Sequence, residues 1–223
     1  TVRSGNSFGH SISLENQTVI VGSTGDDNSV VNEEDERGAT GAAYIFRERG
    51  GRWIQTTKLL PHDTIEGDDL GWAVAINGNT AVVGSPYNSA GGPESGAAYI
   101  YAKQGEKWIK QVKLIDTVSS SEDEFGYSVA ITDDTAVVGS RQDDRRGINT
   151  GSVYVYVSRT DDKGETRWDK QSILTADDPA IGAQFGHAVA VDEDTIIVGA
   201  HRMDDTGIDS GAAYLFARTS DVW

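Results

Sequence analysis

The chain has 223 residues, a formal net charge of −16 at pH 7, 26 Gly, 4 Pro and no Cys. This acidic balance argues against binding to nucleic acid or to an anionic membrane, since both need a basic face. The lack of Cys excludes disulfides and thiolate metal sites. No apolar run approaches the roughly 18–20 residues of a membrane span, so direct membrane insertion is not expected.

A 15-residue unit occurs four times along the chain. It begins with a large apolar residue and Gly, and it ends in Gly without any internal insertion, so it is expected to fold as one piece of structure. The four copies are FGHSISLENQTVIVG (8–22), LGWAVAINGNTAVVG (70–84), FGYSVAITDDTAVVG (125–139) and FGHAVAVDEDTIIVG (185–199). We therefore interpret residues 1–223 as a single domain or part of a larger one, with repeats covering approximately 8–62, 70–117, 125–177 and 185–223.

The first half of each unit predicts an antiparallel hairpin. Residues 11–14 alternate small and branched side chains with period two, as a strand does. The polar residues 15–17 suit a tight turn. Residues 18–21 are β-branched and largely apolar on both faces, so this second strand should be covered on both sides.

Two further strands complete each repeat. After a loop comes a segment rich in aromatic residues, such as residues 42–46, and then a segment that begins with Trp, such as residues 53–59. Four short antiparallel strands in a repeat of about 55–60 residues predict an all-β β-propeller built of four-stranded blades. A β-solenoid is the alternative, although solenoid repeats are usually much shorter.

These motifs carry a family resemblance over essentially the whole chain. The pattern FG-x-S-V-A-I, T-A-V-V-G-S, G-A-A-Y-I-Y and W-x-x-x-x-K-L resembles the FG-GAP repeat of integrin α-like β-propellers, and it is closer to the bacterial and protist form. The resemblance implies a propeller of about seven blades. No turn matches the D-x-D-x-D-G calcium loop of integrins.

The fourth repeat is predicted to lack its outer strand. Trp223 occupies the position at which Trp53 and Trp108 start that strand, so 15 of 16 strands are expected. Two interpretations follow: a piece of a longer propeller, or a small ring or open array completed by another chain. An unpaired edge strand is a template for a partner's strand, so self-assembly through the open last blade is one expectation.

Paired aspartates recur in the loop between the second and third strands of three repeats. Carboxylate oxygens in acidic loops suit Ca²⁺, which takes six to eight oxygen ligands. The alternative is that these side chains cap turns and stay solvated. The candidate metal ligands are Asp26, Asp27, Asp143, Asp144, Asp204 and Asp205.

Other candidate residues point to packing or to modification. His10 and His187 share a column with Trp72 and Tyr127, which favours a flat amphipathic ring near the mouth of the channel. Asn16 starts an N-glycosylation sequon on a predicted exposed turn. We find no catalytic motif and no position at which the repeat symmetry is broken for catalysis.

We therefore expect a non-catalytic, extracellular or cell-surface module that binds protein or glycan or builds an assembly. Two alternatives remain: a calcium-dependent lectin with sugar sites between blades, and an accessory domain of a secreted enzyme. Fold alone does not decide between them.

Overall fold

The structure, a computed structural model, describes residues 5–27, 38–118, 121–220 and 222–223. Within these ranges the chain forms 15 strands in four antiparallel sheets, and none of the described residues is helical. The described part therefore contains no helix that could cross a membrane. The all-β prediction is confirmed, and the sheets hold four, four, four and three strands.

Each sheet follows the order of the chain from its innermost to its outermost strand. The first sheet comprises β1 (Phe8–Glu15), β2 (Thr18–Ser23), β3 (Ala42–Arg49) and β4 (Arg52–Leu59). The second comprises β5 (Val74–Asn77), β6 (Thr80–Ser85), β7 (Ala97–Gln104) and β8 (Lys107–Leu114). The third comprises β9 (Phe125–Ile131), β10 (Thr135–Ser140), β11 (Ser152–Thr160) and β12 (Thr166–Leu174), and the last comprises β13 (Phe185–Asp192), β14 (Thr195–Ala200) and β15 (Ala212–Ala217).

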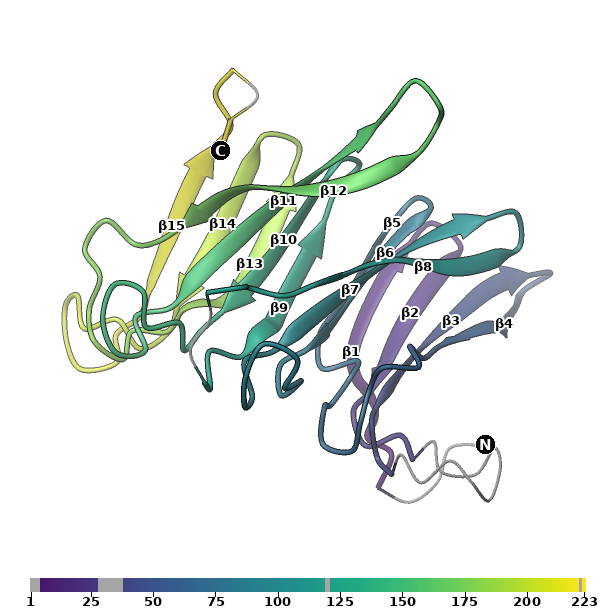
Figure 1. Cartoon of the computed structure of the whole chain (residues 1–223), viewed down its shortest axis with the longest axis horizontal. Helices are drawn as coiled ribbons and strands as arrows, with labels where there is room; N and C mark the ends of the chain where they lie inside the picture. The colour runs from purple at the N-terminus through teal and green to yellow at the C-terminus, as the bar shows by residue number, and fades with distance from the viewer. Residues whose placement is uncertain (1–4, 28–37, 119–120, 221) are drawn as a thin grey trace.

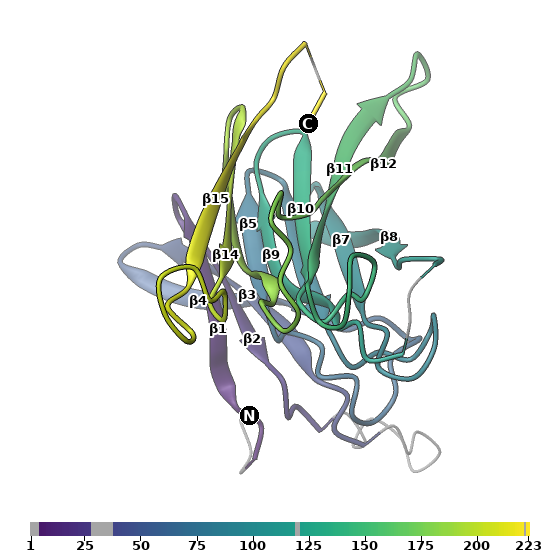
Figure 2. The ribbon, with the colours of Figure 1, turned by 90° about the vertical axis from the view of Figure 1, so that its left-hand side faces the viewer.

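The four sheets are stacked face to face in a row, as the blades of a propeller are (Figure 1). The innermost strands β1, β5, β9 and β13 contact one another in succession, while the outer strands barely touch. The first and last sheets lie at opposite ends of this row, and Figure 2 views the molecule from the end formed by the last sheet. The arrangement of these four sheets is propeller-like.

The hydrophobic core is divided into three layers, one at each contact between neighbouring sheets. We call each such contact a seam. Ile20 and Ile45 of the first sheet meet Val74 and Tyr99 of the second, and the two later seams repeat this pattern. This explains the apolar character of both faces of β6 and β10, because the second and third sheets are covered on both sides.

The large residue that opens each of the last three repeats contacts the preceding sheet. The backbone N–H of Phe125 donates a hydrogen bond to the carbonyl oxygen of Ser95 at 3.0 Å, and that of Phe185 donates to Thr150 at 2.9 Å. The Phe125 and Phe185 side chains are fully buried. The first residues of each of these repeats therefore belong to a seam as well as to their own hairpin.

The end of the last sheet agrees with the predicted position of Trp223. The chain turns back after β15 through a bridge between Thr219 and Val222. The carbonyl oxygen of Trp223 accepts a hydrogen bond from Ser172 Oγ of β12 at 2.7 Å, and its ring packs against the third seam. Within the described residues the last sheet thus has three strands, as predicted.

Candidate functional site

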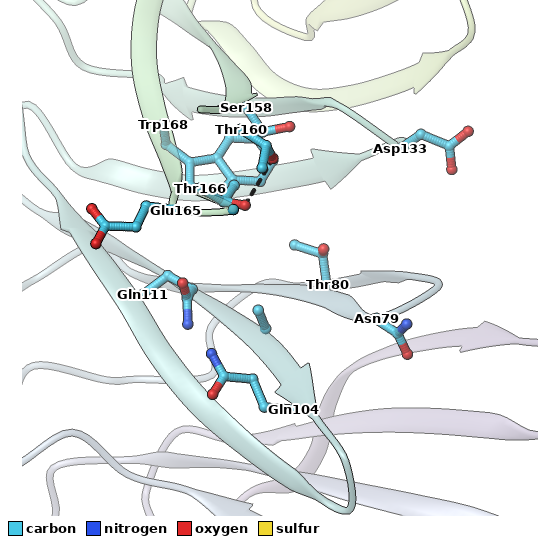
Figure 3. A pocket seen from close by; sticks show the side chains of 12 residues that line it. Asn79, Thr80, Gln104, Gln111, Asp133, Ser158, Thr160, Glu165, Thr166 and Trp168 are labelled. Atoms are coloured by element: carbon cyan, nitrogen blue, oxygen red, sulfur yellow. Dashed lines mark hydrogen bonds between the residues drawn. The ribbon is translucent and has the colours of Figure 1, made fainter. Parts of the chain in front are cut away.

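A groove of about 650 Å³ opens between the second and third sheets, at the end where the hairpins turn (Figure 3). Its lining combines amide and hydroxyl side chains with a single tryptophan. The lining residues are Asn79, Thr80, Ala102, Gln104, Gln111, Asp133, Ser158, Thr160, Gly164, Glu165, Thr166 and Trp168. A concave site with a few polar groups and an aromatic surface is typical of a ligand site.

Trp168 is the aromatic element of the groove. It lies on β12 and is half-buried, because one side of it packs against the core between the second and third sheets. The amides of Gln104 and Gln111, from β7 and β8, lie across the groove from it (Figure 3). Beside the ring, the hydroxyl groups of Thr160 and Thr166 lie 2.9 Å apart and share a hydrogen bond.

Two carboxylates also line the groove, Asp133 from the turn before β10 and Glu165 from the turn before β12. They lie on opposite sides of the groove and their carboxyl groups point away from each other (Figure 3). A general acid and a general base must both reach the same reacting atoms. These two side chains do not converge in that way.

A row of aromatic rings runs along the other end of the sheets, where the innermost strands begin. The ring of Trp72 lies 4.6 Å from that of His10 and 5.4 Å from that of Tyr127, measured between centroids. His187 continues the row at 5.2 Å from Tyr127, and His201 ends it at 3.9 Å from His187. The predicted column of flat rings is therefore a continuous contact across all four sheets.

A guanidinium group covers one ring of this row. Arg141 Cζ lies 3.8 Å above the centroid of the Tyr127 ring. Glu124 binds the same guanidinium, and this pairing raises the pKa of Arg141 although burial lowers it. Burial is also the main cause that lowers the pKa of His187, followed by the nearby His201, so the neutral imidazole is favoured there.

The predicted metal ligand Asp26 lies in an ion pair. Its carboxylate is buried, accepts a hydrogen bond from the Tyr44 hydroxyl, and lies 2.8 Å from Lys58 Nζ. Burial and this carboxylate raise the pKa of Tyr44, which stays protonated. The neighbouring Asp27 forms a backbone bridge with Ala39.

The predicted ligand Asp143 has a similar environment in the third sheet. Its Oδ2 lies 2.6 Å from the Tyr154 hydroxyl and 3.7 Å from Arg145 Nε. Asp116, which follows the second sheet, shares both partners at 3.0 Å and 2.8 Å. These residues therefore connect neighbouring sheets.

The third aspartate pair is not equivalent to the other two in position. The carbonyl group that accepts a hydrogen bond from the Gly opening the third strand belongs to Asp26, Asn88, Asp143 and Met203 in the four repeats. Met203 thus occupies the position predicted for Asp204. Asp204 instead corresponds to Asp144: each accepts a backbone N–H at 2.7 Å, from Asp209 and Asn149 respectively.

Among the described residues, no group of three or more His, Asp or Glu side chains is placed to hold a metal ion. Asp144, Asp204 and Asp205 are exposed. Asp144 and Asp204 accept backbone bonds within their own loops, which is the turn-capping arrangement left open by the sequence.

The sequon residue Asn16 lies where it was predicted. It is exposed in the turn between β1 and β2 and has a φ of 50°, a left-handed conformation that Asn tolerates. Its side chain is therefore accessible for modification.

Comparison with protein-family models gives a match that extends over all four repeats. The model is described as the FG-GAP repeat, and it matches residues 2–46, 53–101, 108–156 and 168–216. The chain belongs to the FG-GAP repeat family. No curated protein matches the chain. FG-GAP repeats are generally non-catalytic structural or binding modules.

The matched units are offset from the sheets. Each of the last three begins with Trp at an outer strand and ends on the third strand of the following sheet. One FG-GAP unit therefore spans one seam. The groove beside Trp168 lies between two such sheets, so its lining comes from distant parts of the sequence, which is why no sequence motif revealed it.

Proposed function

We propose that this chain is a non-catalytic, extracellular binding module whose ligand is a neutral glycan held in the groove between the second and third sheets. The observation that carries the proposal is the combination of Trp168 with the amides of Gln104 and Gln111 in one groove. A sugar ring has an apolar face that stacks on an aromatic ring, and its rim carries hydroxyl groups that both donate and accept hydrogen bonds.

The groove chemistry matches a neutral ligand better than a charged one. Each Gln amide offers a carbonyl acceptor and two N–H donors, and each Thr hydroxyl both donates and accepts. Asp133 and Glu165 add negative charge at the edges, and the chain carries a net charge of −16, which disfavours anionic ligands. Neutral hexoses and N-acetylhexosamines meet these conditions.

Two observations support the absence of catalysis and the extracellular location. Asp133 and Glu165 point away from each other, so the groove lacks converging acid and base groups. Asn16 places a glycosylation sequon on an exposed turn, which fits a secreted or cell-surface chain. Membership of the FG-GAP repeat family also supports a binding module, because these repeats are generally non-catalytic structural or binding modules.

A protein ligand is the second candidate, and the aromatic row favours it. The rings of Trp72 and Tyr127 are half-buried, and Arg141 lies beside them. Trp, Tyr and Arg are the residue types that contribute most at protein interfaces. Trp72→Ala would then weaken the binding of the protein ligand, whereas substitutions in the groove would leave its affinity unchanged.

Screening of the chain on a glycan array is the deciding experiment, followed by calorimetry with the best glycan. We expect Trp168→Ala to weaken binding by at least about tenfold, the loss of one central contact. Trp53→Ala is the matched control, because Trp53 holds the same repeat position in the first sheet and lies outside the groove. An array without binding, or equal losses in both variants, would refute the glycan proposal.

The same assay separates the calcium-dependent lectin. Asp143 and Asp144 line a small cavity of about 150 Å³ together with Asp123, and Arg145 already places a cation there. We expect equal glycan affinity in excess Ca²⁺ and in EDTA. Binding that disappears in EDTA and returns with Ca²⁺ would favour the calcium-dependent alternative.

A further inference from the structure

A small cavity opens where the first and second sheets meet, at the end of the sheets opposite the groove. It has a volume of about 180 Å³, and its lining includes Asp63, Asp68, Asn88, Ala90 and Lys113. Ligand pockets usually measure about 300–1,000 Å³, so this cavity suits a group of side-chain size. Ala90 is exposed, so the cavity can be reached from solvent.

In the third sheet an arginine occupies the position of Ala90. Ala90 and Arg145 each lie six residues after the Gly that ends the 15-residue unit of their repeat. Arg145 Nη2 donates hydrogen bonds to Asp116 at 2.8 Å and to the Tyr154 hydroxyl at 3.0 Å. The next seam therefore holds a guanidinium group at the position where this seam has a cavity.

The tyrosine that binds this guanidinium has an equivalent in the second sheet, Tyr99, which lies three residues after Gly96 as Tyr154 lies after Gly151. Tyr99 is fully buried, and its hydroxyl has no hydrogen-bond partner among the described residues. Burial raises the pKa of Tyr99, and the charges of Asp63 and Asp68, which line the cavity, raise it further. Buried polar groups are usually hydrogen-bonded, so this hydroxyl indicates a ligand that donates to it.

The charge around the cavity favours a cation. The two loops that frame it, residues 60–69 and 86–95, carry five carboxylates. Lys110 and Lys113 supply two ammonium groups, and these contact the two oxygens of Asp63 at 3.0 Å and 3.3 Å. Negative charge therefore remains in excess at this end of the seam.

Asp68, on the wall of the cavity, is held by neutral hydrogen-bond donors. Its Oδ2 accepts from the Asn88 amide at 2.6 Å and from the backbone N–H of Ile65 at 3.0 Å. Asp68 is buried, and burial raises its pKa because it disfavours the charged form. A cation in the cavity would stabilise the charged carboxylate.

We propose that this cavity binds an arginine side chain of a protein partner, in the way that the third sheet binds its own Arg145. The guanidinium group donates to the Tyr99 hydroxyl and to Asp68. Arginine fits better than lysine, because a planar guanidinium group donates in several fixed directions at once and an ammonium group is a compact point charge. A metal ion fits less well, because Lys113 already places an ammonium group on the wall. The proposal is independent of the glycan groove, which lies at the other end of the sheets.

Titration of the isotope-labelled chain with two capped tripeptides, acetyl-Gly-Arg-Gly-amide and acetyl-Gly-Lys-Gly-amide, tests the proposal by NMR. We expect the arginine peptide to shift the backbone amide signals of residues 88–90 and to bind at least about tenfold more tightly than the lysine peptide. Tyr99→Phe should weaken the binding of the arginine peptide by roughly tenfold, the effect of losing one hydrogen bond to a charged group. Equal affinities for the two peptides, or shifts confined to other parts of the chain, would overturn the proposal.

Ala90→Arg supplies the guanidinium group from within the chain, as Arg145 does in the third sheet. We expect this variant to keep or raise the melting temperature and to lose the binding of the arginine peptide. Arg145→Ala is the matched comparison, because it opens the equivalent cavity in the third sheet and should add a second binding site for the same peptide. Undiminished binding by Ala90→Arg, or binding by Arg145→Ala but not by the parent chain, would also overturn the proposal.

Discussion

A Cβ placed on Gly84 would lie 2.1 Å from the carbonyl oxygen of Gly126 in the next sheet. The obstructing atom is backbone, so it cannot turn aside as a flexible side chain would. This glycine-to-glycine contact lets the innermost strands of the second and third sheets approach closely, and it recurs at each seam. It explains why the repeat ends in Gly after an otherwise β-branched strand.

Gly84→Ala is therefore expected to lower the free energy of unfolding by roughly 3 kcal/mol, the upper part of the range for overpacking of a tight site. Gly199→Ala is the matched control, since the same repeat position is open on the last sheet. Urea denaturation at low protein concentration measures both, and the control should change by less than about 0.5 kcal/mol. Equal losses would contradict the account of the seam.

Tyr154→Phe should destabilise the chain by about 2–3 kcal/mol, because it leaves the buried carboxylates of Asp143 and Asp116 without their shared hydroxyl. Tyr214→Phe in the last sheet is the control. There the hydroxyl binds the exposed Asp178 at 2.8 Å, and water can replace it, so we expect a loss below about 1 kcal/mol. Thermal or urea unfolding of the two variants would reveal the difference, and a larger loss for Tyr214→Phe would be contrary evidence.

The aromatic row predicts a pH dependence of stability. Burial lowers the pKa of His187 in the folded chain below its ordinary value of 6.5, and His201, Arg141 and Arg202 lower it further. As the pH falls, the unfolded chain therefore binds the proton before the folded chain does. The contribution of the neutral His187 imidazole to the free energy of unfolding is complete above pH 6.5 and is lost as the pH falls below this value.

His187→Tyr introduces the residue type that Tyr127 supplies at the same position of the third repeat. We expect the melting temperature of this variant to fall less between pH 7 and about pH 5 than that of the parent chain. His62→Gln, in an exposed loop, should retain the parent profile. Parallel profiles for the parent chain and His187→Tyr would show that this imidazole is not responsible.

The amide side chains of the groove lead to a further prediction about ligand affinity. Gln111→Ala should reduce affinity for a bound neutral glycan by about three- to tenfold, the effect of losing one or two neutral hydrogen bonds of about 0.5–1.5 kcal/mol each. Gln55→Ala, on the outer strand of the first sheet, is the control, because it lies outside the groove. Calorimetry gives both affinities, and unchanged binding by Gln111→Ala would place the ligand elsewhere.

The positions of the strands could be predicted from the sequence, because they depend on the local pattern of apolar and β-branched residues. The alternation in residues 11–14 and the β-branched run in 18–21 became β1 and β2, and Trp53 marked the start of β4 to within one residue. The column of His10, Trp72, Tyr127 and His187 was also visible, since equal spacing within repeats places equivalent residues in equivalent positions.

The environments of the candidate metal ligands were harder to predict from the sequence. The aspartate pairs look alike in the sequence, yet the hydrogen bond from Gly211 shows that Met203, and not Asp204, matches Asp143. Counting four residues from Gly139 and from Gly199 gives Asp143 and Met203, so the spacing in the sequence already carried this signal. The partner of Asp26, Lys58, lies on β4, and Asp116, which shares the Tyr154 hydroxyl with Asp143, follows the second sheet, so these contacts became evident only in the folded chain.

The sequence by itself determined the repeat, its four strands and the small residues at each seam, because these follow from backbone preference and from which faces must be apolar. Only the tertiary structure decided what lies together across the seams, such as Trp168 opposite Gln104 and Asp116 beside Tyr154. The physical reason is that a seam joins residues from different repeats, and their proximity depends on how closely the glycine contacts let the sheets stack.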